Sequence, residues 1–134
     1  MEIVSISEYS SSLYITELRD LLEGEWGDFA SFETEEGNIR TPPPLIAIEN
    51  ETLVGGLVYS LWPNPETEHT TIWVNGLIVK PNWRRKGIAS TLIQGAMNNK
   101  PLLFVLTEIP HLYSNIGWQT ISKNSEGTVL KYQS

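Results

Sequence analysis

The sequence contains no cysteine, and this absence excludes several kinds of chemistry. Disulfides, thiolate metal sites and a cysteine nucleophile all need a thiol, so none of them is expected. The longest uninterrupted apolar stretch is LLFVL at 102–106, which is far too short to span a membrane. Neither G-x-G-x-x-G nor G-x-x-x-x-G-K-[ST] occurs, so these two phosphate-binding motifs are also absent.

Positive charge is scarce as well. Among 134 residues there are 9 Lys and Arg against 16 Asp and Glu, and the formal net charge is −7. Such a balance argues against nucleic-acid binding, which needs broad cationic surfaces. The first residues, MEIVSISEYS, show no basic region followed by a long apolar one, so we expect no signal peptide and a cytoplasmic protein. The length fits one domain over residues 1–134 with a substantial core.

Hydrophobic patterning predicts a mixed α/β sheet with helices packed on it. Strands are expected at 2–7, 45–50, 52–62, 70–80, 102–107, 118–122 and 128–132. Helices are expected from Leu13 to a stop at Gly24, over 87–99, and as a short helix within 110–117. The pair Gly55-Gly56 inside a strand indicates a bulge or a close approach of two backbones.

The few cations gather where the strand at 70–80 gives way to the helix at 87–99. Arg84, Arg85 and Lys86 precede this helix, and no Ser, Thr, Asp or Asn stands there to cap its first amides. Cations at a helix start also oppose the helix dipole. Both costs are relieved if an anion such as phosphate binds there, and Gly87 would let the backbone approach it closely. The alternative is a solvated basic turn.

Two segments resemble motifs of the GCN5-related N-acetyltransferases, the GNAT family. LIVKPNWRRKGIASTLI is similar to the family's motif A, [QR]-x-x-G-x-[GA], whose specified positions are filled by Arg84, Gly87 and Ala89. LYSNIGW at 112–118 is similar to the L-Y-x-x-x-G-[FW] segment after the fifth strand. The resemblance implies a mostly antiparallel central sheet with flanking helices, splayed between the family's fourth and fifth strands, here 70–80 and 102–107.

The resemblance also implies binding of acetyl-CoA as co-substrate and no metal. The amides of residues 85–89 would hold the pyrophosphate, with Arg84 at the start of the loop. The exposed backbone of the fourth strand would pair with the pantetheine arm. The cofactor-binding residues expected on this basis are Leu77, Ile78, Val79, Arg84, Arg85, Lys86, Gly87, Ile88 and Ala89.

Tyr113 matches the family's tyrosine that protonates the leaving thiolate, a task that suits a phenol with an ordinary pKa of about 10. A role in packing the short helix is the alternative. Asn75 and Gly76 occupy the positions where many members carry the carboxylate that deprotonates the amine. The remaining candidates for a base are Glu108, His111, His69, Glu68 or a water held by Asn75. Of these, Glu108 and His111 lie nearest the expected site, and an amine bound in its neutral form would need no base.

Two functions fit these observations. One is N-acetyltransfer to a primary amine of a small molecule or peptide, and the other is a non-catalytic acyl-CoA-binding module that regulates a partner. The acidic, aromatic segment 23–36 matches the family's variable substrate loop and favours a cationic acceptor. Asn75, Trp26 and Phe29 are therefore candidate acceptor-binding residues. Trp26, Trp62 and Trp73 could supply an apolar interface, so both a monomer and a homodimer are compatible with the sequence.

Overall fold

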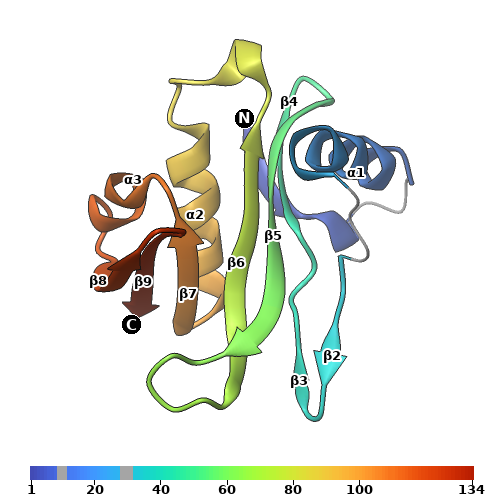
Figure 1. Cartoon of the computed structure of the whole chain (residues 1–134). Coiled ribbons are helices and arrows are strands. Elements are labelled where there is room, and N and C mark those ends of the chain that lie inside the picture. Colours follow the sequence, from blue (N-terminus) through green and yellow to red (C-terminus); the bar gives the residue numbers. More distant parts are fainter. Residues whose placement is uncertain (9–11, 28–31) are drawn as a thin grey trace.

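The central element is a seven-stranded sheet in the order β1-β4-β5-β6-β7-β9-β8 (Figure 1). The structure is a computed structural model that describes residues 1–8, 12–27 and 32–134. Its strands are β1 (Glu2–Ser5), β4 (Leu45–Glu49), β5 (Thr52–Pro63), β6 (Thr70–Val79), β7 (Leu102–Thr107), β8 (Gln119–Asn124) and β9 (Gly127–Gln133). Every pair of neighbours is antiparallel except β6 and β7, which run parallel. This order confirms the expected mixed, mostly antiparallel sheet.

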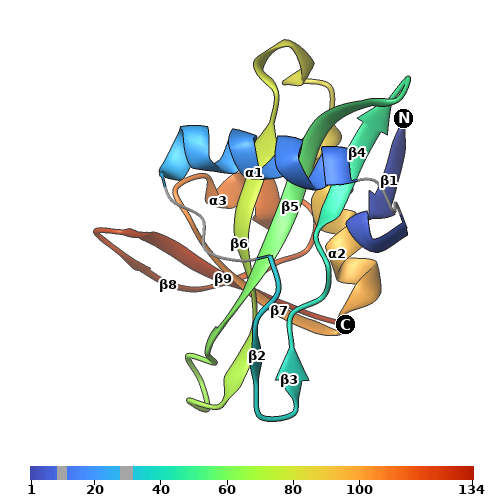
Figure 2. The ribbon, with the colours of Figure 1, turned by 90° about the vertical axis from the view of Figure 1, so that its right-hand side faces the viewer.

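Helices cover both faces of the sheet. Helix α1 (Ser12–Trp26) lies on one face, whereas α2 (Ile88–Asn99) and α3 (Pro110–Ser114) lie on the other (Figures 1 and 2). Two 3-10 turns, η1 (Ile6–Glu8) and η2 (Pro81–Trp83), follow β1 and β6, and a separate hairpin joins β2 (Glu35–Glu36) to β3 (Ile39–Arg40). In the ranges described above, no helix is long and apolar enough to cross a membrane.

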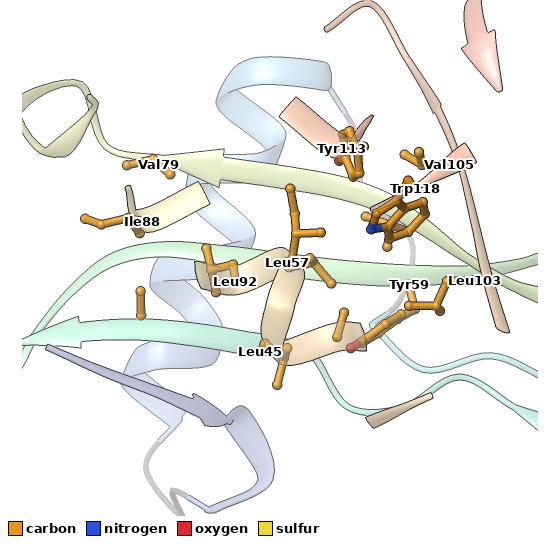
Figure 3. Close-up of a cluster of buried hydrophobic side chains, with 14 of the residues drawn as sticks. Leu45, Leu57, Tyr59, Val79, Ile88, Leu92, Leu103, Val105, Tyr113 and Trp118 are labelled. Atoms are coloured by element: carbon orange, nitrogen blue, oxygen red, sulfur yellow. The ribbon is translucent and has the colours of Figure 1, made fainter. Parts of the chain in front are cut away.

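Each helix packs through the apolar stripe that its sequence predicts. Leu18 and Leu22 of α1 are fully buried against a cluster that includes Val58 of β5. On the opposite face, Leu92 of α2 is buried with Leu57 in a larger cluster (Figure 3). Burying side chains of this size stabilises the fold by about 1.5–3 kcal/mol each. The sheet is therefore held between two hydrophobic layers.

The predicted end of the first helix at Gly24 is wrong. Helix α1 continues to Trp26, and Gly27 ends it with a left-handed φ of 85° while its N–H donates to the carbonyl of Glu23 at 2.8 Å. Glycine inside a helix costs only about 1 kcal/mol, and Gly24 is not among the glycines with a positive φ, so the left-handed end falls at Gly27 instead. As a consequence, the last turn of α1 presents Glu25 and Trp26, which the sequence had placed in an irregular segment.

The predicted irregularity at Gly55-Gly56 is confirmed. Ala47 pairs with Gly55 but Ile48 pairs with Leu53, so the register between β4 and β5 shifts at this point. A Cβ atom on Gly55 would lie 2.7 Å from the carbonyl oxygen of Ile78 on β6. Glycine is therefore required here because a neighbouring backbone occupies the space of a side chain.

Replacing Gly55 by alanine should destabilise the fold. Because the added methyl would overlap a backbone carbonyl, we expect Gly55→Ala to lower the free energy of unfolding by about 1–3 kcal/mol. Gly24→Ala is the matched control, since no atom lies within 4 Å of a Cβ there and alanine favours helix by about 1 kcal/mol. Thermal and urea unfolding should show a lower midpoint for the first variant and an unchanged or higher midpoint for the second. Equal midpoints for Gly55→Ala and the wild type would contradict this packing.

Candidate active-site cleft

Strands β6 and β7 are joined over a short length only. Trp73 faces Phe104 and Val74 faces Val105, and no further pair links these two strands among the described residues. Beyond Val105 the strand β7 pairs with β9 alone. The two parallel strands therefore separate toward their carboxyl ends, as the expected splay requires.

A bulge in β6 coincides with the point of separation. Val58 of β5 pairs with Gly76, whereas the next residue, Tyr59, pairs with Val74, so Asn75 is the extra residue in β6. A bulge bends its strand and increases the local twist. Residues 76–79 stay paired to β5 and have no partner on the β7 side. One backbone edge of this segment is consequently open.

A cleft made of two adjoining cavities occupies the space between the separated strands. The basic cavity has a volume of about 400 Å³ and the acidic cavity about 500 Å³. Both are lined by Trp26 of α1, Leu77 of β6 and Ile109 of the β7–α3 loop. The side chains of Trp26 and Ile109 are 59% and 49% exposed, so they form an apolar rim where the two cavities meet.

The basic cavity brings together most of the residues expected to bind the cofactor. It is lined by Leu77, Ile78, Val79, Arg84, Arg85, Gly87, Ile88 and Ala89. Lys86 is the exception: it lies outside this lining, and its Nζ is 6.0 Å from the centre of the Trp83 ring. Residues of motif A that belong to a strand, a loop and a helix therefore line the same cavity.

The loop before α2 leaves several backbone amides free. Gly87 is the N-cap, with a φ of 80° and no side-chain cap. Arg85 is also left-handed, with a φ of 65°, which is uncommon for a residue other than glycine. Within the described chain, the N–H groups of residues 85–89 have no hydrogen-bond partner. Successive free amides with left-handed residues among them form a concavity that binds anions.

Arg84 connects this loop to the end of β6. Its Nε donates a hydrogen bond of 2.9 Å to the carbonyl oxygen of Val79. That bond satisfies a carbonyl that the sheet leaves unpaired and fixes where the loop begins. Arg84 therefore has a structural role in addition to placing positive charge at the basic cavity.

Tyr113 of α3 lines the acidic cavity. It is only 2% exposed and packs edge-on against Trp118, with ring centres 5.1 Å apart (Figure 3). Burial raises the pKa of Tyr113 above its ordinary value, so the hydroxyl stays protonated and can donate a proton. No described residue makes a hydrogen bond to this hydroxyl. This environment of Tyr113 is therefore compatible both with packing of the short helix and with a chemical role of its hydroxyl.

The structure separates the candidates for a base. Glu108 and Asn75 line the acidic cavity, and both side chains are exposed to it or to solvent. His111 is exposed on α3 and lines neither cavity, and Glu68 and His69 belong to the β5–β6 connection away from the cleft. Of the expected candidates, Glu108 and Asn75 therefore line the cleft.

Of the candidate acceptor-binding residues, Trp26 and Asn75 line the acidic cavity. Trp26 reaches β6, because a Cβ on Gly76 would lie 3.7 Å from its Cζ3 atom. Phe29 lies outside the residues that the structure describes. Trp73, which the sequence offered for an apolar interface, is 7% exposed and stacks beside Phe104 at 5.3 Å. It is therefore a core residue.

Among the cleft residues that sequence reasoning did not name as site residues are Ile109 and Glu126, whereas Glu25 was covered only as part of the acidic segment 23–36. Glu126 belongs to the polar turn between β8 and β9, far along the chain from motif A, and nothing in its local sequence indicates a site. In the acidic segment 23–36, Glu35 instead pairs with Arg40 at 3.1 Å and Glu36 accepts a hydrogen bond from the Thr70 hydroxyl. Of the acids described in this segment, Glu25 alone lines the cleft.

The chain matches a family of acetyltransferases and shares its fold with solved structures. Residues 12–99 match the family described as the acetyltransferase (GNAT) family. Since this match spans more than half of the chain, the protein belongs to the GNAT family. The matched region includes the loop before α2 and ends before α3. No match was found among curated proteins.

Solved structures share the whole fold at low sequence identity. A chain of the NatC complex, solved with a Gag peptide and CoA, has a TM-score of 0.68 and 16% identity, covering 100% of this chain and 99% of that chain. Naa50 of Arabidopsis thaliana, in complex with the bisubstrate analogue CoA-Ac-MVNAL, has a TM-score of 0.68 and 11% identity, with coverage of 99% and 98%. Aminoglycoside 6'-acetyltransferase type Ii has a TM-score of 0.67 and 16% identity, with coverage of 99% and 97%.

Proposed function

We propose that the protein transfers an acetyl group from acetyl-CoA to a primary amine of a small molecule or peptide, by direct attack in a ternary complex. The observation that carries this proposal is one cleft with free helix amides at one end and, at the other, the hydroxyl of the buried Tyr113, which has no hydrogen-bond partner among the described residues. Two neighbours of the same fold were solved with CoA or a CoA-containing bisubstrate analogue.

The basic cavity fits the cofactor's charged half. The free amides of 85–89 and the positive end of the α2 dipole would hold the pyrophosphate, with Arg85 adding charge. The open edge of residues 77–79 offers backbone groups to the amides of the pantetheine arm. Gly87 has no atom within 4 Å of a Cβ position, which leaves room for an anion to approach the backbone.

The acidic cavity would carry out the proton transfers. Acetyl-CoA supplies an activated thioester whose carbonyl carbon accepts an amine. In the overall reaction an N–C bond forms and the C–S bond breaks, and the reacting ammonium gives up two protons. Glu108, or a water held by Asn75, receives the proton that leaves the amine before attack. The Tyr113 hydroxyl supplies the proton that the departing thiolate needs and regains one from the acetylated nitrogen, so one proton is released to solvent.

A non-catalytic acyl-CoA-binding module is the second candidate. It is favoured by one specific observation: the bulge in β6 presents Asn75 followed by Gly76 and carries no carboxylate. Such a module would bind the cofactor through the same loop but would not release CoA.

Binding and turnover measured on one preparation test both candidates. We expect CoA and acetyl-CoA to raise the melting temperature, since a ligand at 100 times its Kd stabilises the folded state by about 2.7 kcal/mol. We also expect free thiol to be released only when acetyl-CoA and an amine are both present, over a panel of alkylamines, diamines and peptides. Binding without thiol release for the whole panel would establish the module instead. If neither CoA nor acetyl-CoA shifts the melting temperature, both candidates fail.

A further inference from the structure

The two ends of the cleft carry opposite charge. Arg84 and Arg85 line the basic cavity, Glu108 and Glu126 line the acidic cavity, and Glu25 lines both where they meet. Within the described ranges, no Lys, Arg or His lines the acidic cavity. The carboxylates come from three separate elements: the last turn of α1, the β7–α3 loop and the β8–β9 turn. Folding therefore gathers negative charge that is dispersed in the sequence.

These carboxylates lack internal counter-ions. Some acids elsewhere form ion pairs, as do Glu17 with Lys80 at 3.3 Å and Glu66 with Lys131 at 2.6 Å. Glu25, Glu108 and Glu126 form no ion pair with any residue in the portion that the structure describes. A cation that enters the acidic cavity would therefore meet carboxylates that are not already paired, and opposite charges attract.

Two further features of the same cavity point to a ligand there. The Tyr113 hydroxyl belongs to a side chain that is 2% exposed, lines this cavity and has no partner among the described residues. Trp26 and Ile109 add exposed apolar surface where the two cavities meet. A polar hydroxyl, an apolar rim and negative charge around one cavity together match a molecule that combines a reacting nitrogen, a methylene chain and a second positive charge.

We propose that the acceptor is a small linear diamine or polyamine, whose second ammonium group is held by Glu25 and Glu126 while the first nitrogen is acetylated. This inference rests on the proposed acetyltransfer and specifies its acceptor. The methylene chain lies along Trp26 and Ile109, and the indole face also attracts a cation. A cavity of about 500 Å³ has the size of a small-molecule site and is suited to such a chain.

The test compares two acceptors that differ by one charge. Diaminobutane carries a distal ammonium where pentylamine carries a methyl group. With acetyl-CoA saturating, we expect kcat/KM for diaminobutane to exceed that for pentylamine by at least about tenfold at low salt. Raising the ionic strength from about 0.02 M to about 0.5 M should narrow this ratio, because salt screens exposed charges.

Variants that remove one carboxylate charge test whether the cleft causes the preference for diaminobutane. Glu25→Gln and Glu126→Gln should each lower the ratio by up to about fivefold, the upper range for an exposed ion pair, and the double variant should lower it further. Glu2→Gln with Glu51→Gln is the matched control, because it removes the same charge at residues that line neither cavity. The control should keep the wild-type ratio.

A binding measurement separates the failure of this inference from failure of the proposed function. Calorimetry of diaminobutane with the CoA-saturated protein needs no turnover, and we expect binding that weakens in the Glu25→Gln, Glu126→Gln double variant. If CoA binds but pentylamine or a peptide with a neutral side chain reacts as well as diaminobutane, the diamine assignment is overturned and acetyltransfer stands. If diaminobutane neither binds nor reacts, the assignment is equally overturned. If CoA itself fails to bind, the proposed function falls first.

Discussion

Tyr113→Phe should lower kcat at least about tenfold while leaving CoA affinity close to that of the wild type. The phenol acts as charge develops on sulfur, so its loss affects the transition state more than the bound ground state. The substitution keeps the ring that packs against Trp118 and removes a hydroxyl that has no partner among the described residues, so the melting temperature should not fall. Initial rates and CoA titration on one preparation measure both effects.

Tyr59→Phe is the matched control for this variant. Tyr59 is also buried in the core, at 3% exposure, and burial raises its pKa to about 12, but it lines neither cavity of the cleft. We therefore expect full activity from Tyr59→Phe. Full activity from Tyr113→Phe as well would show that Tyr113 only packs α3 onto the sheet, and the proposed proton transfer to the thiolate would be wrong.

Gly87→Val should abolish the rise in melting temperature that CoA produces. Position 87 has open space around a Cβ, and this is the space that an anion bound to the free amides would occupy. The left-handed φ of 80° adds a second effect, since a residue with a Cβ loses about 1–2 kcal/mol in this conformation. The variant should therefore melt somewhat lower without ligand and fail to respond to CoA.

Gly37→Val distinguishes loss of the anion site from simple strain. Gly37 also has a positive φ, 60°, and no atom within 4 Å of a Cβ, but it lies in the turn between β2 and β3. This control should show a similar loss of stability and keep the full response to CoA. A normal CoA response in Gly87→Val would remove the loop before α2 from the binding site.

Much of the fold follows from local sequence. The stripe that includes Leu92 predicts α2, and the continuous apolar run at 102–107 predicts the buried strand β7. Both signals are strong because a helix or strand that buries one side must repeat apolar residues at its own period. The pair Gly55-Gly56 is equally informative, since a close backbone approach excludes a side chain whatever surrounds it.

The uncapped, cationic start of α2 was also readable as an anion site from the sequence, because amide satisfaction is a local requirement. The end of α1 could not be predicted in this way. Gly24 resembles a stop, but the left-handed residue that ends the helix is Gly27, and Trp26 packs beside Gly76 of β6. The residues beyond Gly24 are the ones that reach the cleft, Glu25 and Trp26.

The sequence by itself therefore determined the order of elements, the sheet class and the loop that offers free amides, all of which depend on residues near one another in the chain. The tertiary structure decided which of the candidate residues share the acidic cavity and added Glu126 to them. Glu25, Glu108 and Glu126 lie on three elements that border the space where β6 and β7 separate after the bulge at Asn75. Their proximity depends on how a sheet bends and where three loops end, and no periodicity or motif in the chain encodes that geometry.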